Sequence, residues 1–227
     1  MMPLLAQLHA LSDPATATQM AAQSPTPRAF LGIPAQVLDM LARELRRDHD
    51  VPARCDMAQA LWASDVHEAR ILAAKLLTQA RMRPDDSAAW GLIAGWAQDC
   101  DSRALADHVA IAGGKRLQAN PARLEQLAHW ITAPNMWTRR AALVMTLPWA
   151  RLPHPKPAEM AVREQVLDWA AQLAPDRDRF IQNAIAGWLR DLSRRDPDRV
   201  RAFLAGPGAA LGLPAKREAE CLLPPAP

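Results

Sequence analysis

The sequence predicts an all-α protein, and two observations support this fold class. Apolar residues recur at spacings of three and four along most of the chain, which places them on one face of a helix. The alternation of apolar and polar residues that marks a half-buried strand is missing, and the 227 residues include no tyrosine. A sheet would therefore have little material from which to form.

Helix start and stop signals divide the first half of the chain into five predicted helices. Asp65 and Glu68 have the spacing of a capping box and predict a helix that runs to about Met82. Asp101 and Ser102 are expected to cap another helix. The five helices are expected at 36–48, about 53–63, 65–82, from 85–87 onward, and from 101–102 to 113–114.

The second half opens with Asn120 and Pro121, an N-cap residue followed by proline at the first helical position. Further helices are predicted at about 135–150, 158–173 and 177–195. Most arginines of the last segment lie off its apolar face, so one side should pack and the other should carry positive charge. The apolar face consists of Ile181, Ala184, Ile185, Trp188, Leu189 and Leu192.

The lengths and spacing of these helices indicate a repeat architecture. Antiparallel pairs of helices would recur roughly every 35–45 residues, which is the organisation of a HEAT-like (ARM-type) helical-repeat superhelix. Sequence identity between the pairs is weak, so a compact helical bundle is the alternative. We expect a single domain over 1–227, with an N-terminal helical segment at 1–30 and a partly flexible C-terminal tail at 206–227.

Composition narrows the class of partner. The formal net charge is +3, and residues 139–201 carry twelve Lys and Arg against eight Asp and Glu, which suggests a polyanionic ligand. Cys55, Cys100 and Cys221 have no paired spacing and are expected to be reduced thiols. The N-terminus lacks the basic region of a signal peptide, and no stretch is apolar enough to span a membrane. We expect a cytoplasmic, nucleoid-associated monomer.

The usual chemical motifs are missing. Gly113–Lys115 lacks the upstream glycine and the Ser or Thr of a phosphate-binding loop. His67 and Glu68 are not followed by the second histidine of a zinc helix, and the other histidines show no ligand spacing. We therefore expect no metal site and no cofactor.

Six short segments, in their order and spacing, carry a resemblance to a known family. They are 30–34 (FLGIP), 61–62 (LW) with 67–70 (HEAR), 101–107, 135–140 (NMWTRR), 180–182 (FIQ) with 188–190 (WLR), and 216–219 (KREA). In these segments the chain resembles the HEAT-like-repeat DNA alkylation-repair glycosylases of the AlkD type. The resemblance implies a basic concave face that binds duplex DNA. It also implies removal of purines alkylated at N3 or N7 without flipping of the base.

The resemblance also implies roles for particular residues. An alkylated purine is cationic, and its glycosidic bond breaks through an oxocarbenium-like sugar that a carboxylate stabilises. Asp107 matches the catalytic aspartate of the family, and Arg140 matches the arginine that holds the phosphate of the lesion strand. The further DNA-binding candidates are Arg139, Lys156, Arg179, Arg190, Arg194 and Arg195.

The sequence departs from the family at the aromatic residues of the pocket. Arg103 stands where the family has a tryptophan, and Gly187 stands where it has a second one, with Trp188 displaced by one position. A tyrosine of the family pocket has no counterpart. The sequence therefore supports two main hypotheses, an alkylpurine DNA glycosylase or a non-catalytic DNA-binding relative that recognises damaged or branched DNA. A helical-repeat scaffold for another protein is a third.

Overall fold

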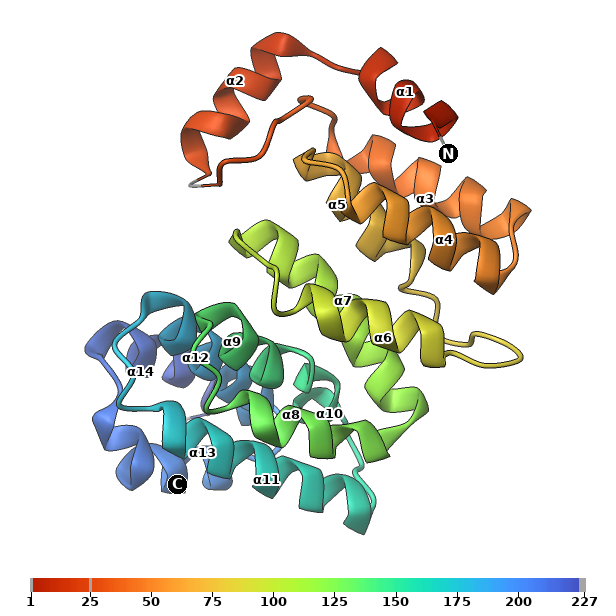
Figure 1. Ribbon diagram of the computed structural model, residues 1–227. Helices are drawn as coiled ribbons and strands as arrows, with labels where there is room; N and C mark the ends of the chain where they lie inside the picture. Colours follow the sequence, from red (N-terminus) through yellow and green to blue (C-terminus); the bar gives the residue numbers. More distant parts are fainter. Residues whose placement is uncertain (1, 25, 225–227) are drawn as a thin grey trace. The chain divides into compact units, whose positions relative to one another are not determined.

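The computed structural model describes residues 2–24 and 26–224, which form helices and connecting segments (Figure 1). The described residues contain no strand, and the one isolated bridge joins Ala29 and Val66. The prediction of an all-α fold is confirmed. Within the same ranges, no helix is both long enough and apolar enough to cross a membrane.

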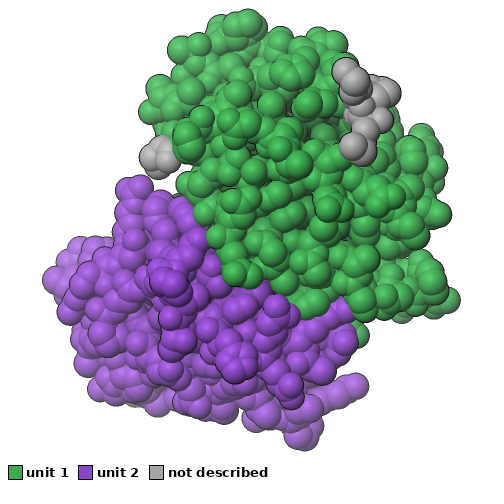
Figure 2. Space-filling view, viewed as in Figure 1, with its two compact units in different colours: residues 1–119 green, residues 120–227 purple. Residues whose placement is uncertain are grey.

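The chain divides into two compact units, residues 1–119 and 120–227 (Figure 2). The helices of the first unit are α1 (Met2–Ala10), α2 (Pro14–Gln23), α3 (Ala35–Asp48), α4 (Val51–Trp62), α5 (His67–Leu76), α6 (Ser87–Trp96) and α7 (Arg103–Ala119).

Helix α5 is the centre of the first unit. It packs against α3, α4 and α7, and every one of its residues is buried, including His67, Glu68 and Lys75. Burial on all sides explains why polar residues of this helix need partners inside the protein. Glu68 finds them in the backbone, because its carboxylate accepts hydrogen bonds from the amides of Leu31 and Gly32 at 3.0 and 2.7 Å.

Three sequence predictions in this unit are wrong: the capping box at Asp65 and Glu68, the helix end near Met82, and the helix end at 113–114. The capping box at Asp65 and Glu68 does not form, because Glu68 binds the distant 31–33 backbone and Asp65 lies 3.0 Å from the guanidinium of Arg28. The helix also ends at Leu76 rather than near Met82. Helix α7 continues through Gly113 and Gly114 to Ala119, because both glycines are buried in helix packing that outweighs a propensity cost of about 1 kcal/mol each.

The second unit is built around α12. Its elements are the 3₁₀ helix η1 (Pro121–Arg123), α8 (Leu124–Trp130), α9 (Met136–Val144), α10 (Leu147–Arg151), α11 (Pro157–Leu173), α12 (Arg179–Ser193), α13 (Pro197–Ala205), the 3₁₀ helix η2 (Pro207–Ala210) and α14 (Leu213–Glu220). Helix α12 packs against α9, α10, α13 and α14. The six apolar residues predicted to face the core are all buried, which confirms the amphipathic reading of this helix.

Residues 206–224 contain η2 and α14, and α14 packs closely on α12. Ala215 and Ala219 of α14 are buried. The side chain of Gln182 on α12 accepts a hydrogen bond from the amide of Gly212 at 2.9 Å and donates to the carbonyl of Ala174 at 3.0 Å. One buried amide side chain thus links α12 to the segments before and after it.

Candidate functional site

Asp107, the candidate catalytic residue, lies on the exposed face of α7. Ser102 precedes the helix, and its hydroxyl accepts from the amide of Leu105 at 3.4 Å. Arg103, Asp107 and Ile111 follow at intervals of four and share the exposed face. The side chain of Asp107 is 40% exposed and that of Arg103 is 63% exposed. The carboxylate is therefore accessible to a ligand.

Arg103 forms an ion pair with Asp107, with 3.5 Å between Nε and Oδ2. The resemblance described above implies only that a tryptophan is missing at this position. The structure adds that Arg103, which stands in place of that tryptophan, brings a positive charge beside the candidate catalytic carboxylate. An exposed i,i+4 pair of this kind contributes only about 0.3–0.5 kcal/mol, so a ligand can break it at little cost.

The residue that follows Asp107 is held without charge. His108 is half-buried, and this burial together with the nearby cation of Lys75 lowers its pKa from 6.5 to about 4. Lys75 itself donates to the carboxylate of Asp39 at 2.5 Å. At neutral pH, His108 therefore adds no positive charge next to Asp107.

In the second unit, the N-terminal ends of α9 and α12 bring together two segments that are 43 residues apart in sequence. Asn135 caps α9 by accepting from the amide of Trp137 at 2.8 Å, and Asp178 caps α12 by accepting from the amide of Phe180 at 2.7 Å. The rings of Trp137 and Phe180 are 4.8 Å apart between centroids.

Two arginines flank this pair of rings. The guanidinium carbon of Arg140 lies 5.9 Å from the centroid of Trp137, and that of Arg179 lies 4.6 Å from the centroid of Phe180. Both distances are in the range of cation–π attraction. The exposures differ, because Arg140 is only 6% exposed whereas Arg179 is exposed. Arg140, Trp137, Phe180 and Arg179 are thus linked by ring and cation–π contacts.

Two of the DNA-binding candidates are engaged within the second unit. Arg139 donates to the carbonyls of Ala133 and Pro134 and to the carboxylate of Asp176 at 2.8, 2.9 and 3.0 Å. Arg190 on α12 donates to Glu218 on α14. These two side chains fasten segments of the unit to one another, which sequence alone does not reveal.

The other candidates remain accessible. Lys156, Arg194 and Arg195 are exposed, and the side chains of Arg194 and Arg195 make no hydrogen bond or ion pair with any described residue. Trp188 is fully buried, as expected for a tryptophan displaced onto the packing face. At Gly187, an added Cβ would meet no atom within 4 Å.

Sequence reasoning missed two features. It assigned Glu68 to a helix cap, and it passed over Arg54, Arg81 and Arg83, which line a hollow in the first unit. The sequence does carry a signal for the arginine-lined hollow. In the segment Arg81-Met82-Arg83 the two arginines are two residues apart, and residues two apart in an extended segment share a side. Among residues 2–24 and 26–224, no group of three or more His, Cys, Asp or Glu side chains is arranged to hold a metal ion.

Comparison with known proteins identifies solved structures that share this fold. Solved structures similar to this one include a predicted DNA alkylation repair enzyme from Enterococcus faecalis, with 22% identity, a TM-score of 0.78, and coverage of 95% of this chain and 98% of that one. Another is AlkD2 from Streptococcus mutans, with 18% identity, a TM-score of 0.62, and coverage of 84% and 90%. At these identities the likeness shows the fold.

No curated protein sequence matches the chain. The model of the DNA alkylation repair enzyme family matches residues 4–223, which is nearly the whole sequence. The chain therefore belongs to the DNA alkylation repair enzyme family.

Proposed function

We propose that the protein binds duplex DNA containing alkylated purines and hydrolyses the N-glycosidic bond of cationic N3- or N7-alkylpurines without flipping the base. It would act as a monomer on nucleoid DNA in the cytoplasm. Membership of the family indicates a role in DNA repair. The observation that carries the finer proposal is the carboxylate of Asp107, which matches the family's catalytic aspartate and is 40% exposed on α7.

A carboxylate beside C1′ is the main requirement of this chemistry. When the bond between C1′ and the base nitrogen breaks, its electron pair neutralises the purine, and positive charge develops on the sugar. A carboxylate about 4 Å away stabilises that charge by about 4 kcal/mol at an effective dielectric of about 20, or roughly a thousandfold in rate. Water then adds to C1′ and loses one proton to the carboxylate or to solvent.

The second unit would hold the DNA backbone. Arg140 is proposed as the clamp on the lesion-strand phosphate, where a planar guanidinium can donate two hydrogen bonds. Lys156, Arg179, Arg194 and Arg195 are exposed and are proposed as direct phosphate contacts. Arg139 and Arg190 have acidic partners in their own unit, so we propose that they support the surface rather than contact DNA.

One observation favours a second candidate function. Arg103 replaces a ring that would pack on the sugar, and its guanidinium pairs with Asp107 at 3.5 Å. A cation at this place repels the developing oxocarbenium charge but attracts phosphate. The alternative is a non-catalytic DNA-binding relative that recognises damaged or branched DNA.

Release of 7-methylguanine and 3-methyladenine from methylated duplex DNA distinguishes the two candidates. We expect Asp107→Asn to reduce single-turnover release by about a thousandfold, while DNA affinity is unchanged or improved because a negative charge is removed. Asp56→Asn, at an exposed aspartate on α4, is the matched control and should retain the wild-type rate. Equal release by the wild type and by Asp107→Asn, with DNA binding intact, would instead establish the non-catalytic binder.

A further inference from the structure

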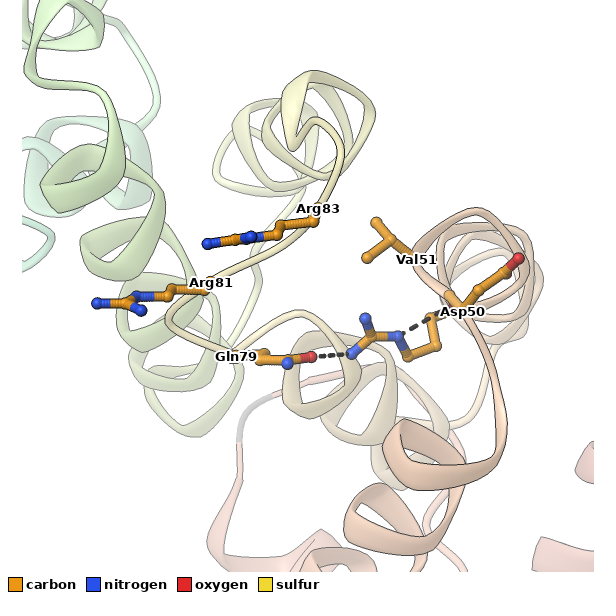
Figure 3. Close-up of a pocket in the computed structure, with 6 residues that line it drawn as sticks. Asp50, Val51, Gln79, Arg81 and Arg83 are labelled. Atoms are coloured by element: carbon orange, nitrogen blue, oxygen red, sulfur yellow. Dashed lines mark hydrogen bonds between the residues drawn. The ribbon is translucent and has the colours of Figure 1, made fainter.

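The first unit contains a surface hollow of about 380 Å³ lined by Asp50, Val51, Arg54, Gln79, Arg81 and Arg83 (Figure 3). It lies between the start of α4 and the segment that connects α5 to α6. Three of the six lining residues are arginines. The one acidic residue, Asp50, is already used as the N-cap of α4, where its carboxylate accepts from the amide of Ala53 at 2.9 Å.

Arg54 forms the buried wall of the hollow. It is only 4% exposed, its Nε donates to the carbonyl of Asp50 at 3.2 Å, and its Nη1 donates to the side-chain oxygen of Gln79 at 2.5 Å. Both acceptors are neutral, and no described residue accepts from Nη2. A buried guanidinium without a carboxylate partner is costly, and burial lowers its pKa.

A second arginine, the half-buried Arg46, adds to this positive charge. Arg46 donates to the carbonyl of Lys75 and the hydroxyl of Thr78, both at 2.7 Å, so its acceptors are neutral as well. Burial and the nearby cation of Arg54 lower the pKa of Arg46. The two guanidiniums repel each other, and an anion beside Arg54 would relieve that repulsion.

Arg81 and Arg83 form the open wall. Both are exposed, and neither side chain has a hydrogen bond or ion pair with any described residue. Met82 between them is buried, which anchors the segment and sends its two neighbours outward together. Figure 3 shows the two side chains extending from the segment in the same direction.

The segment that carries these arginines is fixed at both sides. Gln79 is held by Arg54, as described above. Arg116 on α7 is fully buried and donates to the carbonyls of Gln79 and Ala80 and to the carboxylate of Asp86, the last at 2.9 Å. The guanidinium groups of the hollow are therefore presented on a preorganised backbone, which reduces the entropy lost when a ligand binds.

We propose that this hollow is a binding site for a phosphate group, with Arg54 as its buried donor and Arg81 and Arg83 as its exposed donors. A phosphate offers several anionic oxygens that guanidinium groups bind in a planar, bidentate manner. The site is independent of Asp107 and of excision. The phosphate can belong to the DNA backbone or to a free phosphate compound.

Calorimetric titration of the full-length protein with inorganic phosphate, at constant ionic strength kept with sodium chloride, tests the site. We expect one saturable site in the wild type and at least tenfold weaker binding in Arg81→Gln/Arg83→Gln. The exposure of both side chains makes this double variant safe for folding. Arg43→Gln/Arg47→Gln is the matched control, because it removes two exposed arginines of the same unit that do not line the hollow. Its affinity for phosphate should equal that of the wild type.

No saturable binding by the wild type, or equal binding by Arg81→Gln/Arg83→Gln, would overturn the proposal. The salt dependence of duplex DNA binding then identifies the source of the phosphate. If the DNA backbone occupies the hollow, the log–log slope should fall by about 1.8 in Arg81→Gln/Arg83→Gln but not in the control pair, since each contact contributes about 0.9. Equal slopes in the two double variants, with inorganic phosphate binding still lost only in the first, would assign the site to a free phosphate compound.

Discussion

Removing the charge of Arg103 is expected to accelerate excision if Asp107 is the catalytic carboxylate. The guanidinium lies 3.5 Å from the carboxylate, so it is close to the place where the sugar would become cationic. Arg103→Gln removes the positive charge and keeps a polar side chain of similar reach. Arg103→Lys keeps the charge and is the matched control.

The size of the effect follows from this geometry. With C1′ about 4 Å from Asp107 and the guanidinium on its far side, the two cations are about 7 Å apart. Their repulsion is about 2.4 kcal/mol at an effective dielectric of about 20 and about 0.6 kcal/mol in bulk water. Because the Arg103 side chain is 63% exposed, the true value should lie between these limits. The expected gain in rate is therefore about 3- to 60-fold.

Single-turnover release of 7-methylguanine from methylated duplex DNA measures this gain. Arg103→Trp should raise the rate further, since it also restores a ring that can pack on the sugar for perhaps 1–2 kcal/mol. The melting temperature should change by no more than about 2 °C, because the exposed ion pair contributes little. An unchanged or slower rate in Arg103→Gln, with DNA binding intact, would refute the idea that Arg103 opposes the reaction.

Three further predictions concern pH, folding and DNA binding. First, the folded protein resists protonation of His108 between its ordinary pKa of 6.5 and its lowered pKa of about 4, so stability should fall as pH drops through this range. In denaturant titrations, His108→Gln should lose roughly 2–4 kcal/mol less than the wild type between pH 7 and pH 4, and parallel pH profiles would contradict this. Second, Glu68→Gln should cost roughly 2–4 kcal/mol in unfolding free energy, because a neutral amide cannot accept from the backbone amides of Leu31, Gly32 and Ile33 as a carboxylate does. Asp65→Asn is its exposed control, and a similar cost in both would show that burial of Glu68 is unimportant. Third, Arg194→Gln/Arg195→Gln should lower the salt slope of DNA binding by about 1.8 without changing the melting temperature, whereas Arg139→Gln should lower the melting temperature and leave the slope unchanged. The reverse pattern would mean that the contacts of Arg139 with Asp176 and two carbonyls do not keep it from DNA.

Sequence signals predicted a helix well where its capping and packing residues bond to groups that are near in sequence. The helix expected at 36–48 is α3 (Ala35–Asp48), and that expected at 158–173 is α11 (Pro157–Leu173). Asn120 caps its 3₁₀ helix as expected, with its side-chain oxygen 3.2 Å from the amide of Ala122. A cap is satisfied within one turn, so a few adjacent residues carry the whole signal.

The same reasoning fails where the partner is distant in sequence. Glu68 has the spacing of a capping residue, yet its carboxylate binds amides more than 30 residues away. Gly32 is part of that arrangement, because it has a φ of +75° and an added Cβ would lie 2.3 Å from the carbonyl oxygen of Asp13. Neither residue is marked by periodicity, since the reason for each lies in tertiary contact.

The candidate DNA surface shows the same limit for charge. Counting arginines in residues 139–201 predicts a basic region but does not say which guanidiniums are available to a phosphate. Arg139 and Arg190 are neutralised by acidic neighbours, whereas Arg194 and Arg195 have no such partners among the described residues. A guanidinium that already donates to a carboxylate must lose that bond before it can bind DNA, and it then gains little. The number of phosphates that DNA binding neutralises should therefore follow the count of accessible, unpaired arginines, not the net charge of the segment.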